Sequence, residues 1–557
     1  MIRTSLDGAA QTHHETIIIG SGPAGLTLAM ELARLGRPSL VLESGAAAAG
    51  AAQELAAADI VDPARHDSMS LAVARRLGGT SNLWGGRCLP LDPIDFEPRA
   101  FAQDARWPIG YHDIAPFYET ACRYAHCGEA VFEALSPGWR GVNDDFSFSA
   151  IERASNQPRF QQAHAAELAE SSLIDVRLNA TVVDLNLGEN ARIESVAVVG
   201  ADGRRRQLRG DRIVIAAGGL ESTRLLLGLQ RKHEDLFGGA AGPLGRFYMG
   251  HIIGEIADIV FADGRLDEAF DFQLDGRGSY VRRRFTPSAT LQREDTLPNI
   301  GFWPVVPSIA DPRHASGPLS AVAMALSTPT LGRALIPELI RARHVPASID
   351  WIAHAGNVMA DLPATLGFLG GFIRKRYLSE FRIPGYFLRN RARRYGLSYH
   401  SEQSPIAASR VTLAPTTDRL GQPKLRVDLR FSRDDAEGVV RAHQRLAEWL
   451  TASGFGRIDY RQDDSANVDA VTERMAHGSH QIGTARMGRS RREGVVDGDL
   501  SCFDCRNLYV ASSAVFPTSG QANPTLSIVA FAARLAAHLI AEANASAPAL
   551  TRAPAYA

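Results

Sequence analysis

The chain has 557 residues, of which 45% are hydrophobic, with 60 Lys and Arg against 61 Asp and Glu. Single hydrophobic cores stop growing near roughly 250 to 300 residues, so this length predicts two or more domains. The formal net charge of −1 provides no overall field to attract a polyanion, so we expect no nucleic-acid partner.

The N-terminal region and the cysteines favour a cytoplasmic location. The first twenty residues contain neither an apolar stretch of signal-peptide length nor a twin-arginine pair. The five cysteines are too few for a disulfide framework and fit a reducing compartment. They are Cys88, Cys122, Cys127, Cys502 and Cys505. The last two form a CxxC without a second pair at zinc spacing, so we expect an ordinary turn and no metal site.

A β-branched run at residues 16–19 is followed by a glycine-rich turn and an apolar helix at residues 26–35. The turn has the pattern GxGxxG, with glycines at Gly20, Gly22 and Gly25. In a dinucleotide-binding unit the first allows a tight turn, the second lets the backbone approach a pyrophosphate, and the third lets the helix pack on the strand. A second strand ends at Glu43, where its carboxylate would accept hydrogen bonds from a ribose. The pattern predicts FAD or NAD without distinguishing them, and disfavours NADP.

A second glycine-rich loop, RLGGTSNLWGGR, occupies residues 76–87. Here the chain resembles the glucose-methanol-choline (GMC) oxidoreductase family, in which a similar loop passes over the flavin and the pyrophosphate. The resemblance implies FAD and assigns cofactor contacts to Gly79, Thr80, Ser81, Asn82 and Trp84. The tryptophan is most similar to the branch of pyranose 2-oxidase and bacterial sugar dehydrogenases. That branch can attach its flavin through a histidine just before the tryptophan, but Leu83 stands there, so we predict non-covalent FAD.

Two further segments resemble the same family. Residues 175–187 are predicted to form a strand, and residues 212–222 a strand, a glycine turn and a helix start. The resemblance assigns a backbone contact with adenine to Val182 or Val183, and positions beside the dinucleotide to Ala217 and Gly218. Residues 244–251 resemble a third segment, in which we expect His251 to be structural.

The C-terminal motif HQIGTARMG resembles the family segment that carries the catalytic histidine, and it places His480 in that position. An imidazole suits a base because its pKa of about 6.5 lies near neutrality. Asn523 matches the second catalytic position, where an amide would orient the substrate oxygen; His477 is the competing base. Pro524 and Thr525 open a predicted helix whose N-terminus would stabilise a reduced flavin. Arg534 and His538 interrupt this helix, so we predict a buried helix and no integral membrane segment.

Between residues 255 and 470 the resemblance fades, and family members build a variable substrate domain there from an antiparallel sheet and helices. Residues 410–413 and 424–429 are predicted to be paired strands, and residues 434–451 a helix. The basic segment 331–394 is interpreted as helices with a solvated basic face, with a lid, an oligomer contact or a membrane-surface element as alternatives. Five residues are candidates for lining the pocket: Trp303, Trp351, Tyr399, His400 and Glu402.

Together these features predict an α/β protein, α+β overall, with a Rossmann-like FAD-binding domain and a substrate domain on an antiparallel sheet. The predicted FAD-binding parts are residues 14–100, 170–254 and 475–545, with cap elements at 101–169 and the substrate domain at 255–474. The predicted function is FAD-dependent oxidation of an alcohol to a carbonyl, on a sugar, glycoside or polyol. A non-sugar alcohol, a non-redox cyanohydrin lyase, a purely NAD-dependent enzyme and a non-catalytic flavin-binding module are the alternatives. The electron acceptor, whether O2, a quinone or a redox protein, and the oligomeric state stay open.

Overall fold

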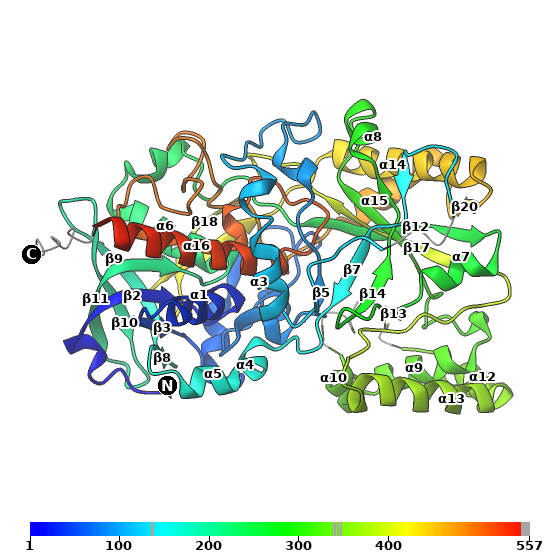
Figure 1. Cartoon of the computed structure of the whole chain (residues 1–557), viewed down its shortest axis with the longest axis horizontal. Coiled ribbons are helices and arrows are strands. Elements are labelled where there is room, and N and C mark those ends of the chain that lie inside the picture. Colours follow the sequence, from blue (N-terminus) through cyan, green and yellow to red (C-terminus); the bar gives the residue numbers. More distant parts are fainter. Residues whose placement is uncertain (135–138, 337, 339–340, 342–344, 346–347, 547–557) are drawn as a thin grey trace, which may run out of the picture.

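The computed structural model describes residues 1–134, 139–336, 338, 341, 345 and 348–546. They form two lobes side by side, one holding the N-terminal segment and the long C-terminal helix, the other built from the middle of the chain (Figure 1). The predicted mixed α/β class, with a dinucleotide-binding unit and sheets of several strands, is confirmed.

The first lobe is organised around an eight-stranded sheet with the order β1-β8-β3-β2-β11-β10-β9, in which β21 also pairs with β11. Its strands are β1 (Ile2–Arg3), β2 (His13–Ile19), β3 (Ser39–Leu42), β8 (Ile174–Arg177), β9 (Thr181–Leu187), β10 (Ile193–Val199), β11 (Arg205–Ile215) and β21 (Leu508–Val510). β2, β3, β8, β11 and β21 run parallel, while β9 and β10 add an antiparallel hairpin. The parallel strands are apolar on both faces because helices cover them.

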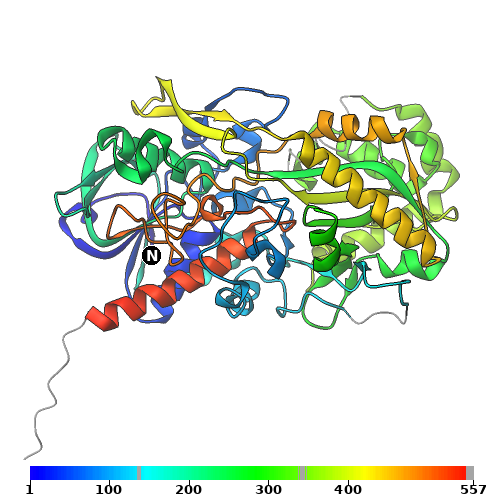
Figure 2. The ribbon, with the colours of Figure 1, turned by 90° about the horizontal axis from the view of Figure 1, so that it is seen from above.

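The helix α1 (Pro23–Arg34) follows β2 directly, with Pro23 at its first turn, and packs against α16 (Thr525–Ser546). α16 also packs against α3 (Phe117–Tyr124) and crosses the whole first lobe (Figure 2). Among the described helices, only Thr525–Ala545 is long and apolar enough to cross a membrane, and more than half of that stretch is buried inside the fold. Its apolar composition is accounted for by this packing.

The predicted single strand at residues 175–187 is wrong. The structure has two strands there, β8 and β9, and the chain turns between them at Asn179, whose φ is 53°. Asparagine tolerates this left-handed conformation better than most residues do. The turn takes the chain from β8, beside the edge strand β1, to β9 at the opposite edge of the same sheet.

The second lobe contains a four-stranded antiparallel sheet with the order β16-β17-β12-β20. Its strands are β12 (His251–Phe261), β16 (Ile300–Val305), β17 (Arg394–Glu402) and β20 (Gly456–Tyr460). The helices α14 (Arg433–Ala452) and α15 (Asp464–Arg474) pack on it. α14 confirms the predicted helix, and its Ser432 N-cap accepts a hydrogen bond from Asp435 N at 3.0 Å.

Two smaller sheets lie between these main ones. β18 (Arg410–Thr417) and β19 (Pro423–Asp428) pair antiparallel, as predicted, but β19 also pairs with β4 (Ala58–Ile60) from the N-terminal part of the chain. The other sheet has the order β13-β14-β7-β5, with β5 at Arg87–Cys88, β7 at Ile151–Ala154, β13 at Gln273–Leu274 and β14 at Tyr280–Arg283. This second sheet brings charged side chains from three distant segments together beside the site described below.

In the described part of the chain, the outer edge of the second lobe carries the helices α9 (Gly317–Ser327), α10 (Pro329–Leu335), α12 (Trp351–Ala360) and α13 (Leu362–Ile373). α10, α12 and α13 each contact α9, and together they form the lower right part of the molecule (Figure 1). A π-helical turn, η8 (Arg374–Leu378), ends α13.

Candidate active site

A cavity of about 440 Å³ begins at the carboxyl ends of the parallel strands and extends to the C-terminal histidine motif. Its wall includes the last residues of β2 and β3 and the turn that follows β11. Parallel α/β sheets bind their ligands at these carboxyl ends of the strands. The N-termini of α1, α6 (Gly219–Lys232) and α16 also reach it. Three helix N-termini and the carboxylate of Glu43 therefore face a single space.

The geometry at the strand ends suits a dinucleotide. At Gly22 and Gly218, the N-caps of α1 and α6, no protein atom lies within 4 Å of where a Cβ would be, and neither helix has a side-chain cap. The first N–H groups of α1 are therefore available to an anionic group, whereas in the first turn of α6 Leu220 N already donates to Gln481 Oε1 at 3.1 Å. Glu43 Oε2 accepts hydrogen bonds from Ser21 N at 3.1 Å and Ser21 Oγ at 2.6 Å, while Oε1 accepts one from Gly45 N at 2.8 Å. These bonds hold the carboxylate at the wall of the cavity.

The other end of the cavity holds a group of histidines. His480 and His477 line it with ring centroids 4.5 Å apart, and the His400 ring lies 5.8 Å from that of His480. His251 is fully buried behind them on β12, and its Nδ1 lies 2.9 Å from His480 Nδ1. Burial lowers the pKa of His251 to about 3, so this ring is neutral near neutral pH.

Nitrogen atoms of His251, His477 and His480 lie within 4.8 Å of one another, close enough for a cation to be considered. The short contact between His251 and His480 is accounted for by a hydrogen bond between the two rings. The site is therefore interpreted as one for proton transfer.

A chain of hydrogen bonds decides which nitrogen of His480 carries the proton. Arg87 Nη1 donates to Asn523 Oδ1 at 3.1 Å, and because a guanidinium only donates, it fixes the orientation of the amide. Asn523 Nδ2 then lies 3.2 Å from His480 Nε2 and donates to it. His480 Nε2 is consequently the lone-pair nitrogen and Nδ1 carries the hydrogen, which is donated to His251. In the structure this lone pair accepts from Asn523 Nδ2, and both side chains line the cavity.

Arg87 belongs to a buried ionic cluster formed by three neighbouring strands. Its Nε donates to Glu152 Oε2 at 2.5 Å, and Arg282 Nη2 donates to Glu152 Oε1 at 2.6 Å. Arg282 and Glu152 are direct cross-strand partners on β14 and β7. Burial alone would raise the pKa of Glu152, but Arg282, Arg87 and Arg284 outweigh it and lower that pKa to about 2. The carboxylate therefore stays charged and holds Arg87 against Asn523.

Trp303 on β16 covers this cluster. The Arg87 guanidinium lies 4.4 Å and that of Arg282 4.9 Å from the centre of its ring, within cation–π range. Both Arg87 and Trp303 line the cavity. This end of the site therefore offers an aromatic face beside N–H donors.

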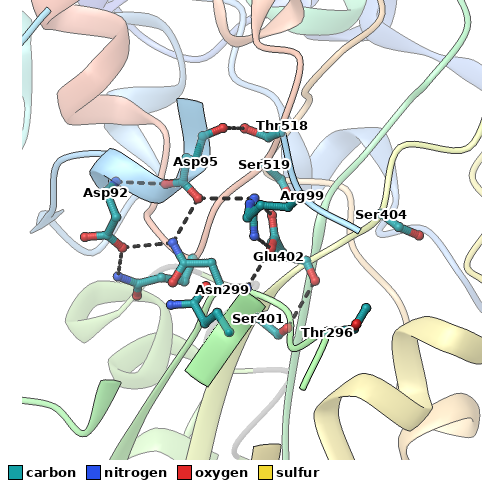
Figure 3. Close-up of polar contacts among 12 residues, drawn as sticks. Asp92, Asp95, Arg99, Thr296, Asn299, Ser401, Glu402, Ser404, Thr518 and Ser519 are labelled. Carbon is teal, nitrogen blue, oxygen red and sulfur yellow. Dashed lines mark hydrogen bonds and ion pairs between the residues drawn. The ribbon is translucent and has the colours of Figure 1, made fainter. Parts of the chain in front are cut away.

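The loop that carries Asn523 is held by a polar cluster between the lobes (Figure 3). Gln521 Nε2 donates to Asp92 Oδ2 at 2.9 Å, and His400 Nδ1 donates to Gln521 O at 2.6 Å. In the same cluster Asn299 Nδ2 donates to Asp95 Oδ1 at 2.9 Å. Burial and the charge of Asp92 raise the pKa of Asp95 to about 8. Asn523 is thus positioned by contacts from both lobes.

The pairing of Arg99 with Glu402 completes this cluster. Arg99 Nη2 donates to Glu402 Oε2 at 2.8 Å, and both side chains are almost fully buried (Figure 3). A buried pair of this kind is costly to break from one side, because the remaining charge has no partner. The contact joins the loop after β5 to the end of β17.

Comparison with known proteins decides the family. Residues 405–532 match the family model described as GMC oxidoreductase, and residues 15–238 match the model described as FAD binding domain. The chain belongs to the GMC oxidoreductase family. Its cofactor is FAD, and it is an FAD-dependent oxidoreductase acting on CH–OH donors.

Individual relatives of this GMC oxidoreductase are distant. It is 22% identical to paromamine 6'-oxidase from Streptomyces fradiae over 94% of this chain and 90% of that protein. It is 32% identical to the C-glycoside 3-oxidase of Arthrobacter globiformis over 133 residues, 23% of each chain. Pyridoxine 4-oxidase from Mesorbium loti shares the fold, with a TM-score of 0.52 at 16% identity over 94% of this chain and 99% of that chain.

Most residues predicted to bind the cofactor line the cavity of the GMC oxidoreductase. They are Gly20, Gly22, Glu43, Gly79, Thr80, Ser81, Trp84, Ala217, Gly218, Pro524 and Thr525. Val182 lines it as well, whereas Val183 does not, because successive residues of β9 point to opposite faces. Asn82 does not line it either. Its amide donates to Leu77 O at 3.0 Å and Gly79 O at 2.8 Å and so braces the loop.

Gly25 has the packing role that the glycine pattern predicts. A Cβ at this position would lie 2.0 Å from Gly20 O, so only glycine lets α1 approach the end of β2. Gly25 does not line the cavity.

The five candidate pocket residues divide into two groups. Trp303 and His400 line the cavity. The other three do not: Tyr399 lies in the core of the second lobe, Glu402 pairs with Arg99, and Trp351 is 46% exposed on α12. These three predictions were wrong because the cavity is reached only by the side chains that point toward it. Strand alternation and the packing of other segments decide which side chains do so.

Sequence reasoning missed Arg87, Glu152, Arg282 and the contact of His251 with His480. The expectation that His251 is structural stays a prediction, and its 2.9 Å contact with His480 shows what it would hold in place. One signal was available, since Arg282 and Arg284 are two positions apart and would share a face if this segment were extended. Their partner Glu152 lies 130 positions from Arg282 and had no local signal.

Proposed function

We propose that this enzyme oxidises a secondary or primary alcohol of a sugar, glycoside or other polyol to a carbonyl. The observation that carries the proposal is the hydrogen-bond chain from Arg87 through Asn523 to His480, which leaves a basic nitrogen facing the cavity. The FAD-dependent oxidation of a CH–OH group follows from the family.

In the proposed mechanism the substrate hydroxyl displaces the hydrogen bond between His480 Nε2 and Asn523 Nδ2 and contacts both atoms. His480 Nε2 accepts the hydroxyl proton, and Asn523 Nδ2 donates a hydrogen bond to the substrate oxygen and orients it. His251 accepts the Nδ1 hydrogen of His480 and keeps the ring in this tautomer. Bound FAD supplies the hydride acceptor. The N-terminus of α16, with Pro524 and Thr525 on the wall, contributes partial positive charge beside it.

The sugar or polyol class is supported by the end of the cavity near Trp303. An aromatic face can pack on the C–H surface of a polyol, while Arg87 and Asn523 offer N–H donors to its hydroxyls. The match to a protein named C-glycoside 3-oxidase supports the same class.

The decisive experiment is anaerobic mixing of the purified yellow protein with a panel of sugars, glycosides, sterols and simple alcohols. We expect a polyol or glycoside to bleach the flavin absorbance. In His480→Gln the bleaching should be slower by about 100-fold to 10,000-fold, the usual contribution of a general base, with FAD content unchanged. Failure of every alcohol to bleach the flavin would favour the non-redox lyase, and a colourless protein would favour a NAD-dependent enzyme.

Re-oxidation identifies the electron acceptor in the same experiment. Rapid return of colour on admitting air indicates an oxidase, whereas return only with a quinone or a redox dye indicates a dehydrogenase. We propose a cytoplasmic enzyme, and fractionation of cells into soluble and membrane-bound parts tests this location.

A further inference from the structure

The helices α12 and α13 present an unusual surface at the outer edge of the second lobe (Figures 1 and 2). Their large apolar side chains point to solvent: Ile352 is 87% exposed, Met359 71% and Leu366 61%, with Trp351 and Ile373 about half exposed. We call residues 351–373 the apolar hairpin. Monomeric soluble proteins seldom expose so many adjoining apolar side chains without a binding role.

Charge is almost absent from the apolar hairpin. Asp361, at the junction of the two helices, is its only Asp, Glu, Lys or Arg. The other exposed positions are Leu362 and several alanine, glycine and proline residues. A surface helix of a soluble protein normally has a charged or polar face toward water. The outer faces of α12 and α13 have none.

The inner faces are already packed, so the apolar surface belongs to a fixed structure. On α12, His354 Nδ1 lies 2.9 Å from Ser320 Oγ, and Asn357 Nδ2 donates to Pro312 O at 2.8 Å. On α13, Phe368 and Phe372 pack against each other and against Tyr386. The outer faces are therefore held in place rather than available to turn inward.

A basic segment follows the apolar hairpin directly. Residues 374–382 contain four Lys and Arg and one Glu. Arg374 and Lys375 are exposed, next to the exposed Tyr377 and Leu378. Arg376 is different, since it is mostly buried and donates to Ile383 O at 2.5 Å and Pro384 O at 2.9 Å. The interpretation of residues 331–394 as helices with a solvated basic face is confirmed in part. The basic residues Arg374, Lys375, Arg389, Arg391, Arg393 and Arg394 are exposed, but they follow α13, and the outer faces of α12 and α13 are apolar.

We propose that the apolar hairpin is a docking surface for an anionic lipid bilayer. The α12 and α13 helices have 10 and 12 residues, too few to span a membrane, so they would lie in its interface. Trp351 at the start of α12 and Tyr377 just after α13 flank the apolar stretch in sequence and are both exposed, and amphipathic rings of this kind favour lipid headgroups. Arg374 and Lys375 complement the headgroup charge. This proposal is independent of the reaction at the active site.

Sedimentation with vesicles tests the proposal on the full-length, FAD-containing protein. We expect binding to vesicles of phosphatidylcholine mixed with phosphatidylglycerol, and weaker binding to phosphatidylcholine alone. Reversal of the exposed charges in R374E/K375E should weaken binding by about fivefold or more for each charge. Ile352→Glu with Leu366→Glu should weaken it by about tenfold or more, since the buried aliphatic area is lost. Trp351 fluorescence should be quenched by brominated lipids, with Trp351→Phe as the reference for the other tryptophans.

The matched control is Val142→Glu, at an apolar residue of the second lobe that is 60% exposed outside the apolar hairpin. It should bind vesicles like the unmodified protein, and all variants should keep FAD absorbance and flavin reduction. The proposal is overturned if the unmodified protein fails to bind anionic vesicles or if Val142→Glu weakens binding equally. It is also overturned if Ile352→Glu dissociates a dimer in sedimentation velocity, because the surface then contacts a second copy.

Discussion

Asn523 is held from two sides, and this determines what His480 can do. Its amide oxygen accepts from Arg87, and its amide nitrogen donates to His480 Nε2. Without Arg87 the amide could rotate and present its oxygen to Nε2, which would favour a protonated nitrogen there. A hydrogen bond to a charged group contributes about 1.5 to 3 kcal/mol, so we expect Arg87→Met to slow anaerobic flavin reduction by about 10-fold to 100-fold. Stopped-flow absorbance across a range of pH measures this effect.

Arg87→Lys provides the comparison, because it keeps the charge and one donor and should recover part of the rate. Glu152 remains paired with Arg282 in both variants, so FAD content should not change. Equal rates in the Met variant and the unmodified protein at every pH would show that Arg87 does not position Asn523.

Leu83 carries a second prediction at the residue scale. It lines the cavity just before Trp84 and has no nucleophilic atom to bond a flavin. We therefore expect acid precipitation to release all the FAD into a yellow supernatant and leave a colourless pellet. A pellet that keeps flavin fluorescence after washing would show a covalent link through another residue.

Single residues differ in how far sequence could predict them. His480 and Asn523 each lie in a short motif that can be recognised in the sequence. Arg87, Glu152 and Arg282 meet only because β5, β7 and β14 pair across long separations in sequence. Such pairing depends on tertiary structure, and no local pattern in one chain encodes it.

At the scale of elements, the turn from β2 into α1 separates two roles of glycine. Gly22 has a φ of −73° that any residue adopts, and a Cβ there meets no protein atom within 4 Å. Gly22→Val should therefore change the free energy of unfolding of the apoprotein by less than about 0.5 kcal/mol, yet lower FAD affinity by about tenfold or more. Thermal unfolding of the apoprotein and FAD titration by fluorescence measure the two effects.

Gly25→Val is the matched contrast, three residues further along. Its Cβ would meet Gly20 O at 2.0 Å, so the apoprotein itself should lose about 3 kcal/mol or more. If both variants destabilised the apoprotein equally, the space beside Gly22 would not be reserved for a ligand.

Elements with a clear apolar pattern in the sequence were predicted well. Elements whose role depends on which neighbouring segments pack against them were not. The strands β3 and β19 and the helix α14 follow directly from their apolar patterns. The apolar hairpin has equally helical sequence, but helical periodicity does not tell which neighbour covers which face. Its exposed side became evident only from the packing of α12 and α13 on α9.

At the scale of the whole molecule, buried neutral histidines connect the stability of the fold to pH. Burial lowers the pKa of His251 to about 3, that of His443 to about 4 and that of His400 well below its usual value. In the unfolded chain these rings would take up protons below about pH 6.5. Their contribution to stability is therefore complete above that pH and is lost as the pH falls from about 6.5 toward 4. Each ring adds a slope of about 1.4 kcal/mol per pH unit.

His443 allows this to be tested apart from the active site. Its ring lies in the core of the second lobe against Phe302 and Tyr399, away from the cavity. In His443→Phe the unfolded state binds one proton fewer below about pH 6.5. The slope of the unfolding free energy against pH, measured between about pH 6 and about pH 5, should therefore fall by the contribution of one ring. Urea unfolding at saturating FAD measures it, and flavin reduction at neutral pH should stay unchanged. An unchanged slope would mean that His443 is already protonated in the folded protein, and the acid sensitivity would then belong to the two rings that surround His480.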